Sequence, residues 1–130
     1  MILDSSAIVA VLRAEPEAPD FARTIAASES RRVSAVNYVE VAAVIDSGKD
    51  AIASRRFDDF FRASRISVEA VTSRQAEIAR QAYRDFGKGR HKAGLNLGDC
   101  FAYALAKEMD EPLLFKGGDF QHTDVEIAKF

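Results

Sequence analysis

The chain has few of the features that would place it outside a reducing compartment or inside a membrane. It has 130 residues and one cysteine, Cys100, so no disulfide can form within it. A reducing cytoplasm is therefore the expected location. No stretch approaches the roughly 18 to 20 apolar residues that a membrane-spanning helix needs, so we expect no membrane association. The opening MILDSSAIVAVL has no basic segment and is interrupted by Asp4, which is unlike a signal peptide.

A strong excess of one charge is also absent. The chain carries 18 basic and 20 acidic residues, a net charge of -2. Proteins that bind nucleic acid without sequence preference are usually basic. Any such binding must therefore come from a local patch, or from a metal ion that neutralises acids. The chain has no tryptophan, repeat or linker, and 48% of it is hydrophobic, which favours one globular domain over residues 1–130.

The order of apolar and polar segments predicts strands that alternate with helices. Strands are expected at 2–3, 32–36, 66–71, 113–115 and 125–128, the last at an edge. Helices are expected after a cap at Ser5 or Ser6, over 21–28, from Asn37 to Gly48, and over 51–63, 72–86 and 96–109. This order indicates an α/β fold with a parallel sheet covered by helices on both faces.

Four acids follow the strands of this predicted sheet. Asp4 follows the first strand directly, and Asp119 follows the strand at 113–115 after a turn. Glu40 and Asp99 lie in the first turns of two predicted helices. Ligands of such sheets bind beyond the carboxyl ends of the strands. We therefore expect the four carboxylates to meet at one rim.

Carboxylates that meet in this way repel one another unless a cation lies among them. A purely oxygen ligand set suits Mg²⁺ or Mn²⁺. The helix N-termini would help to keep Glu40 and Asp99 ionised. A bound divalent ion activates water and stabilises charge on a phosphate, so the pattern indicates metal-assisted hydrolysis of phosphodiester bonds.

Each acid also has a purely structural explanation, which the residues leave open. Asp4 would cap the first helix, and Asp99 would favour the dipole of its own helix. Glu40 would complete a capping box with Asn37, and Asp119 would be a turn residue after two glycines. Their shared position at one rim, more than any single acid, favours the functional interpretation.

A basic segment precedes the helix that carries Asp99. Its members are Arg84, Lys88, Arg90, His91 and Lys92. They either contact the phosphates of a nucleic acid or form a solvated loop, and His91 is in addition a candidate general acid. Lys116 either contacts phosphate or pairs with an acid. Asn96, three residues before Asp99, either orients a water molecule at the metal or caps the helix.

The motifs resemble those of one family over the whole chain. They are MILDSSA at 1–7, YVE at 38–40, NLGDCFAY at 96–103 and LFKGGDF at 114–120. In combination they are similar to PIN-domain proteins, and among these to the VapC toxins of VapBC toxin–antitoxin modules. The resemblance implies a five-stranded parallel sheet between helices in a three-layer α/β/α arrangement. It also implies an Mg²⁺- or Mn²⁺-dependent ribonuclease that acts on tRNA, rRNA or mRNA.

The resemblance further implies particular partners and site residues. VapC-like proteins usually form homodimers and are inhibited by a VapB antitoxin that fills the active-site groove. Carried over by position, the family's acids are Asp4, Glu40, Asp99 and Asp119. The family's small hydroxyl residue is Ser6, which would donate a hydrogen bond to a carboxylate or to water on the metal.

Two other classes of function remain open at this point. An acidic pocket on such a sheet also suits a phosphatase or a phosphorylatable receiver. For a receiver, Lys116 would be the lysine required near the site, but the pair of acids expected near the start of a receiver is missing. A binding module with a structural ion is the third possibility. The aromatic stripe Phe57, Phe60 and Phe61 belongs either to the core, to a dimer face or to a groove for an antitoxin helix.

Overall fold

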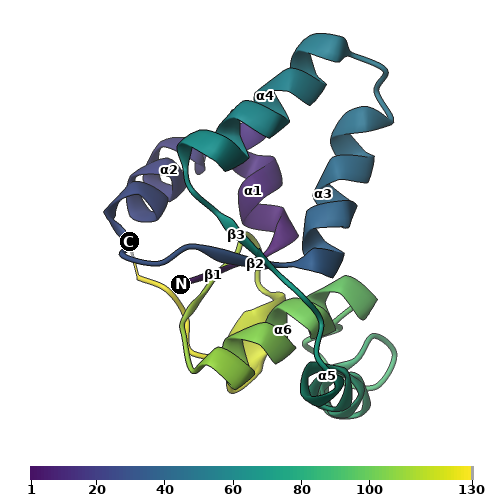
Figure 1. Ribbon diagram of the computed structural model, residues 1–130. Helices are drawn as coiled ribbons and strands as arrows, with labels where there is room; N and C mark the ends of the chain where they lie inside the picture. Colours follow the sequence, from purple (N-terminus) through teal and green to yellow (C-terminus); the bar gives the residue numbers. More distant parts are fainter. Residues whose placement is uncertain (130) are drawn as a thin grey trace.

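A parallel sheet lies between two groups of helices in the computed structural model, which describes residues 1–129 (Figure 1). The strands, in the order β3-β2-β1-β4, are β1 (Ile2–Leu3), β2 (Arg32–Ser34), β3 (Ser67–Glu69) and β4 (Leu113–Leu114). The helices are α1 (Ser5–Leu12), α2 (Ala18–Ala27), α3 (Ala35–Asp46), α4 (Ala51–Ala63), α5 (Ser73–Phe86) and α6 (Leu97–Met109). Within residues 1–129, no helix has both the length and the apolar character that a bilayer crossing requires.

The strands are short and apolar because both faces of the sheet are covered. Ile2 and Leu113 pack into one hydrophobic cluster with residues of α5 and α6. Their neighbours Leu3 and Leu114 pack into a second cluster with residues of α1 to α4. Successive residues of a strand point to opposite faces, so two residues per strand are enough to contribute to both cores. The predicted α/β/α layering is confirmed.

The expectation of about five strands is wrong, because residues 1–129 contain four. The segment 125–128 makes a single bridge, between Ile127 and Leu113. Leu113 donates to the carbonyl of Glu126 and accepts from the amide of Ala128, both at 2.9 Å. β4 is only two residues long, and the carbonyl of Leu114 already accepts from Asp4 at 2.9 Å. A fifth strand therefore has too little backbone to pair with.

The predicted strands at 32–36, 66–71 and 113–115 exist but are shorter. The clearest difference follows β2, where α3 begins at Ala35. The hydroxyl of Ser34 caps α3 by accepting from the amide of Val36 at 3.3 Å. Asn37 is therefore the third residue of α3 and Glu40 the sixth, so the predicted Asn37–Glu40 capping box is wrong. Helix 51–63 is confirmed, and so is the end of α5 at Phe86.

Two further helix starts differ from the predictions. α2 begins at Ala18, three residues before the predicted start, because Pro19 suits the first turn of a helix, where its missing N–H is not needed. The helix expected over 72–86 begins at Ser73, with Thr72 as its cap. Thr72 accepts from the amide of Gln75 at 3.0 Å, but the Gln75 side chain points to Glu108.

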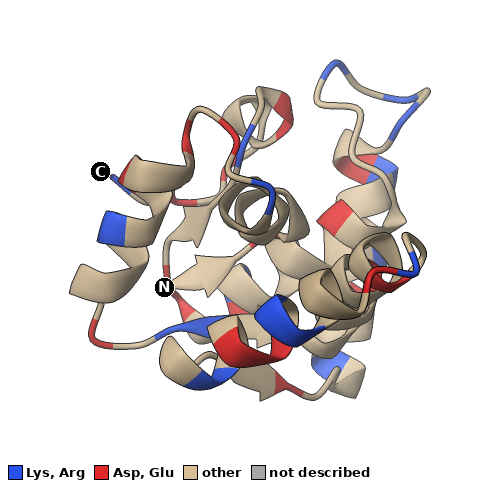
Figure 2. Ribbon diagram, turned by 90° about the horizontal axis from the view of Figure 1, so that it is seen from above, with Lys and Arg blue, Asp and Glu red and all other residues tan. Residues whose placement is uncertain are grey.

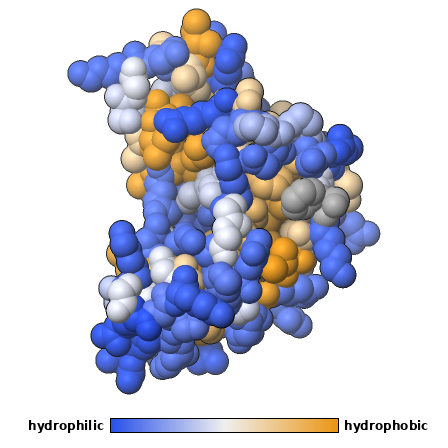
Figure 3. Space-filling model, turned by 180° about the vertical axis from the view of Figure 1, so that it is seen from behind, coloured by the Kyte–Doolittle hydropathy of each residue, from blue (hydrophilic) through white to orange (hydrophobic). Residues whose placement is uncertain are grey.

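The aromatic stripe of α4 belongs mainly to the core. Phe57 is buried, and Phe60 and Phe61 are partly buried against the same hydrophobic cluster. Tyr38 of α3 lies with its ring centroid 5.3 Å from Phe57 and 5.1 Å from Phe61. Next to this packing, Val39 is left exposed. Figure 3 shows an apolar area in the upper part of the molecule, where α3 and α4 lie.

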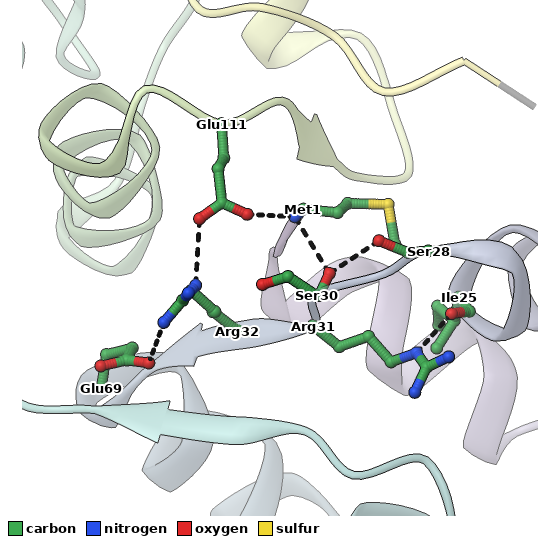
Figure 4. A network of polar contacts seen from close by, with 8 residues as sticks. All are labelled: Met1, Ile25, Ser28, Ser30, Arg31, Arg32, Glu69 and Glu111. Carbon is green, nitrogen blue, oxygen red and sulfur yellow. Dashed lines mark hydrogen bonds and ion pairs between the residues drawn. The ribbon is translucent and has the colours of Figure 1, made fainter.

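A polar network lies at the amino ends of β1, β2 and β4 and extends to Glu69, the last residue of β3 (Figure 4). The carboxylate of Glu111, just before β4, accepts from Arg32 Nε at 3.0 Å and also from the amino group of Met1. Arg32 Nη1 donates to Glu69 at 2.9 Å, and the amino group of Met1 donates to the carbonyl of Ser30 at 3.0 Å. Each acid of this network has a cationic partner.

Candidate metal centre

Asp4 lies where β1 ends and α1 begins, next to the point where the strand order reverses. Its Oδ2 caps α1 by accepting from the amide of Ser6 at 3.0 Å and from Ser6 Oγ at 2.5 Å. Asp4, and not Ser5 or Ser6, is thus the cap. Its Oδ1 is buried and has no hydrogen-bond partner among residues 1–129. One oxygen is therefore structural, and the other remains available to a ligand.

Glu40 reaches the same edge from the second turn of α3. Its Oε1 accepts from Ser5 Oγ at 2.7 Å and from Asn37 Nδ2 at 2.8 Å. Asn37 Nδ2 also lies 3.1 Å from the carbonyl oxygen of Gly98 at the start of α6. Three helices therefore converge on Glu40, and the orientation of its carboxylate is fixed by side chains rather than by a helix cap.

Gly98 allows this convergence. A Cβ atom at Gly98 would lie 2.0 Å from Oε2 of Glu40, far inside van der Waals contact. Gly98 was not among the predicted site residues, and Asn37 was predicted only as a helix cap. A signal was present in NLGDC, because glycine in a helix costs about 1 kcal/mol relative to alanine and therefore has a packing or functional reason.

Asp99 lies in the first turn of α6, as predicted. It forms a capping box with Asn96: Asn96 Oδ1 accepts from the amide of Asp99 at 2.8 Å, and Asp99 Oδ2 accepts from the amide of Asn96 at 3.0 Å. Asn96 therefore caps the helix. Burial, followed by repulsion from Asp4, Asp119 and Glu40, raises the pKa of Asp99 to about 7. The backbone amide of Asn96 at the N-terminus of α6 lowers the pKa of Asp99, as expected, but burial and repulsion outweigh it.

The pKa of Asp4 changes in the same direction. Burial raises it most, and the charge of Glu40 raises it further, while the hydrogen bonds from Ser6 oppose the change. No lysine or arginine among residues 1–129 forms an ion pair with Asp4, Glu40 or Asp99. Negative charge at this edge is thus left without compensation by the described part of the chain.

Asp119 lies at the rim of this group. It is exposed and begins a short 3-10 helix, Asp119–His122, instead of standing in the predicted turn. The backbone amide of Lys116 donates to Ser6 Oγ at 2.9 Å, which ties the segment after β4 to Asp4. The Lys116 side chain points elsewhere, pairing with Glu15 at 2.9 Å and Glu17 at 3.0 Å. Of its two predicted alternatives, pairing with an acid is the one observed.

The donor set fits a hard divalent cation that keeps much of its hydration. Within residues 1–129, no group of three or more His, Cys, Asp and Glu side chains is placed so that it could hold a metal ion by itself. Mg²⁺ usually keeps several waters and is bound through one or two carboxylates. The unpartnered Oδ1 of Asp4 and the charge repulsion on Asp99 are what such an ion would relieve.

The predicted basic segment lies on α5 and on the loop that follows it, where Figure 2 shows blue residues along an extended loop. His91 has a structural role in that loop, because its Nδ1 accepts from the amide of Ala93 at 3.0 Å and its ring packs on Phe86. Lys88 and Lys92 are exposed and form no ion pair within residues 1–129. Their contact with phosphate stays a prediction.

Comparisons with known proteins agree with this arrangement. The family description "PIN domain" matches residues 1–126. Ribonuclease VapC28 of Mycobacterium tuberculosis is 50% identical over 129 residues, which cover 98% of this chain and 97% of that protein. A ribonuclease VapC of Mycolicibacterium smegmatis is 46% identical over 125 residues, covering 96% and 97%. The chain therefore belongs to the PIN-domain family and, within it, to the VapC ribonucleases.

Solved structures show the same fold at low sequence identity. VapC20 of Mycobacterium tuberculosis, described as a Sarcin-Ricin loop cleaving toxin, aligns with a TM-score of 0.73 and 17% identity, covering 98% of both chains. VapBC2 from Rickettsia felis, bound to a DNA fragment from its promoter, aligns with a TM-score of 0.77 and 12% identity, covering 98% of this chain and 96% of that one.

Proposed function

We propose that this protein is a divalent-metal-dependent endoribonuclease, the toxin of a VapBC-type pair, with Asp4, Glu40 and Asp99 at its active centre. The observation that carries the proposal is the uncompensated carboxylate group at the carboxyl edge of the sheet, in a chain that is 50% identical to VapC ribonucleases. Acids placed without cationic partners favour a site that an external cation completes.

The residues of the site have two kinds of role in this proposal, metal binding and positioning. Asp4, Asp99 and Glu40 would hold the ion, which we take to be Mg²⁺ or Mn²⁺, directly or through water. When bound, this ion supplies a water of lowered pKa and stabilises charge on the scissile phosphate. Ser6 fixes Asp4, while Ser5 and Asn37 fix Glu40.

Asp119, exposed at the rim, would serve a second ion or the substrate side of the site. Its negative charge acts on Asp99 together with those of Asp4 and Glu40, which ties it electrostatically to the central group. The charge on Asp99 itself depends on what is bound, since its pKa of about 7 falls when a cation approaches.

The observed position of Lys116 argues against the receiver alternative. A receiver needs a lysine beside its acids, but the Lys116 ammonium is held by Glu15 and Glu17. A phosphatase or an ion-binding module without catalysis remains the competing class, and each would leave RNA uncut.

The partners follow from the relatives. Solved structures with this fold include a toxin–antitoxin complex from Klebsiella pneumoniae, with a TM-score of 0.72. We infer that a VapB-like antitoxin inhibits this protein, that the protein acts as a homodimer on RNA, and that it does so in the cytoplasm. The exposed side chains of Val39 and Ile52 give α3 and α4 an apolar surface that suits a protein partner.

The deciding experiment is the sequencing of RNA ends after induction of the protein, with Asp99→Asn as the matched control. We expect new 5′ ends at a small set of sites with the parent and none with Asp99→Asn. Purified protein should cut the same RNA with Mg²⁺ and stop when the metal is chelated. Equal cutting by both proteins, or none by the parent, would contradict the proposal.

A further inference from the structure

A concave site lies at the N-terminal end of α6. It is a pocket of about 500 Å³ between α5, the loop after it and α6, which we call the arginine pocket. Its apolar lining comes from Ala76, Ala79, Leu97 and Phe101, together with the ring of Tyr83. Leu97 is 69% exposed and Tyr83 40% exposed. Large apolar side chains are therefore open to a ligand here.

The rim of the arginine pocket is positively charged. Arg80, Arg84 and Arg90 line it, and no acidic residue does. None of the three forms an ion pair within residues 1–129, whereas Arg32, for example, is paired with two acids. The Arg90 guanidinium lies 6.0 Å from the centre of the Tyr83 ring. The pocket thus combines an aromatic surface with unpaired cations, in a chain whose net charge is -2.

The pocket is close to the candidate metal centre. Leu97 is the first residue of α6 and Asp99 the third. Two residues correspond to about 200° around a helix, so the two side chains flank the same turn from opposite sides, about one helix diameter of 10–12 Å apart. A single strand lying across the N-terminus of α6 would therefore reach both sites.

We propose that the arginine pocket binds an unpaired nucleobase of the substrate RNA, stacked against Tyr83, while Arg80, Arg84 and Arg90 contact the adjoining phosphates. The inference rests on the proposed ribonuclease function and adds a specificity site to it. Unpaired bases are recognised by stacking on aromatic rings or guanidinium planes, and cations along the groove follow the backbone.

The charge of the pocket disfavours a second copy of the chain as its occupant. A two-fold interface places the same surface patch on both subunits. Two arginine pockets would then bring six unpaired guanidinium groups together without an acid in either lining. An anionic single strand matches the charge, and its bases match the apolar interior.

The test measures binding of a fluorescent single-stranded RNA in the Asp99→Asn background with Mg²⁺, so that cleavage does not interfere. Adding Tyr83→Ala should weaken binding about 10-fold, and Tyr83→Phe should retain most of the affinity. Adding Arg84→Gln should reduce the dependence of log Kd on log salt by about 0.7. Arg56→Gln, on the exposed side of α4, is the matched control and should change neither quantity.

A second measurement separates base stacking from a structural role. An RNA with one abasic position in place of the stacked base should bind the Asp99→Asn protein about 10-fold more weakly than intact RNA. The double variant with Tyr83→Ala should bind the abasic RNA and the intact RNA equally well. Unchanged affinity of Tyr83→Ala for every RNA overturns the inference. A change of molecular mass in sedimentation on substitution of Tyr83→Ala also overturns it, because the pocket would then be a contact between copies of the chain.

Failure of this inference is distinguishable from failure of the proposed function. If the protein with intact Asp99 cuts RNA and Tyr83→Ala leaves kcat/KM unchanged, the pocket is not a base site but the ribonuclease proposal stands. If no RNA is cut while Tyr83→Ala still weakens RNA binding, the ribonuclease proposal fails and the pocket is an RNA site of another kind.

Discussion

Acids at the two edges of the sheet have opposite electrostatic surroundings. At the amino edge, Glu111 is paired with Arg32 and with the amino group of Met1. Burial alone would raise the pKa of Glu111, but these partners lower it below its ordinary value. At the carboxyl edge, burial and neighbouring acids raise the pKa of Asp99 to about 7. One edge is electrostatically complete within the chain, whereas Asp4, Glu40 and Asp99 at the other form no ion pair with a lysine or arginine of residues 1–129.

The comparison distinguishes acids that stabilise the fold from acids that are available to a ligand. Acids that stabilise a chain come with cations from the same chain, because a partly buried charge is costly without a partner. Acids without such cations reduce stability until a ligand arrives. Substitutions at the two edges should therefore have opposite consequences.

The largest effect is expected for Asp4→Asn. Asn keeps the oxygen that caps α1 but removes the charge that would hold the ion, so RNA cleavage should fall by about 1000-fold. Without metal the variant should be at least as stable as the parent, because a buried, repelled carboxylate has been removed. Cleavage rates and thermal melting in EDTA measure the two effects. A variant that loses stability instead would break the contrast between the edges.

Gly98→Ala should reduce cleavage by about 10- to 100-fold without unfolding the protein. The added Cβ displaces the end of the Glu40 side chain, which then loses its hydrogen bonds to Ser5 and Asn37. Alanine itself suits a helix better than glycine, by about 1 kcal/mol. Kinetics and urea unfolding measure both quantities. The matched control is Gly48→Ala, where the nearest atom would lie 3.5 Å away and cleavage should be unchanged.

Glu111→Gln should have the opposite profile, a loss of stability with cleavage kept within about twofold. Losing the charged partner of Arg32 and Met1 should lower the free energy of unfolding by about 2 kcal/mol. Because the pKa of Glu111 is lowered in the folded state, its contribution is present above its ordinary pKa and is lost as pH falls through the folded value. The difference between parent and variant should thus shrink in acid, as denaturant titrations would show.

The smallest effect is expected from the protonation of Asp99. Its pKa is raised from 3.8 to about 7, so between these values the folded protein binds more protons than the unfolded chain. The free energy of unfolding in EDTA should therefore fall as pH rises from about 4 to 7, by about 1 kcal/mol after screening by water. Asp99→Asn should remove this dependence, and so should saturating Mg²⁺ in the parent. A slope that Asp99→Asn leaves unchanged would assign it to other groups.

Much of the fold could be predicted from the chain because it depends on local pattern. The helix at 51–63 has its apolar residues on one side, and Pro112 prevents α6 from extending. The missing fifth strand could not be predicted in this way. Residues 125–128 have a plausible strand pattern, but β4 offers them only two residues of backbone.

The residues of the candidate site were also only partly predictable from the sequence. Asp4 and Asp99 were predictable because each adjoins a strand or helix end that is visible in the sequence. The setting of Glu40 was not, since the pattern suggested a cap by Asn37, whereas Ser34 begins α3 one turn earlier. The pairing of the Lys116 side chain with Glu15 and Glu17 was likewise open until the chain was folded.

The sequence by itself determined the order of strands and helices and the chemistry of the acids at the sheet edge. These follow from apolar periodicity and from residues near one another in the chain. Only the tertiary structure decided which acids lack a partner, how Glu40 is held and why residue 98 is glycine. Those features depend on contacts such as Ser5 with Glu40, 35 residues apart, and Asn37 with Gly98, 61 apart. Such contacts exist only once packing has placed α1, α3 and α6 against one another at one edge of the sheet.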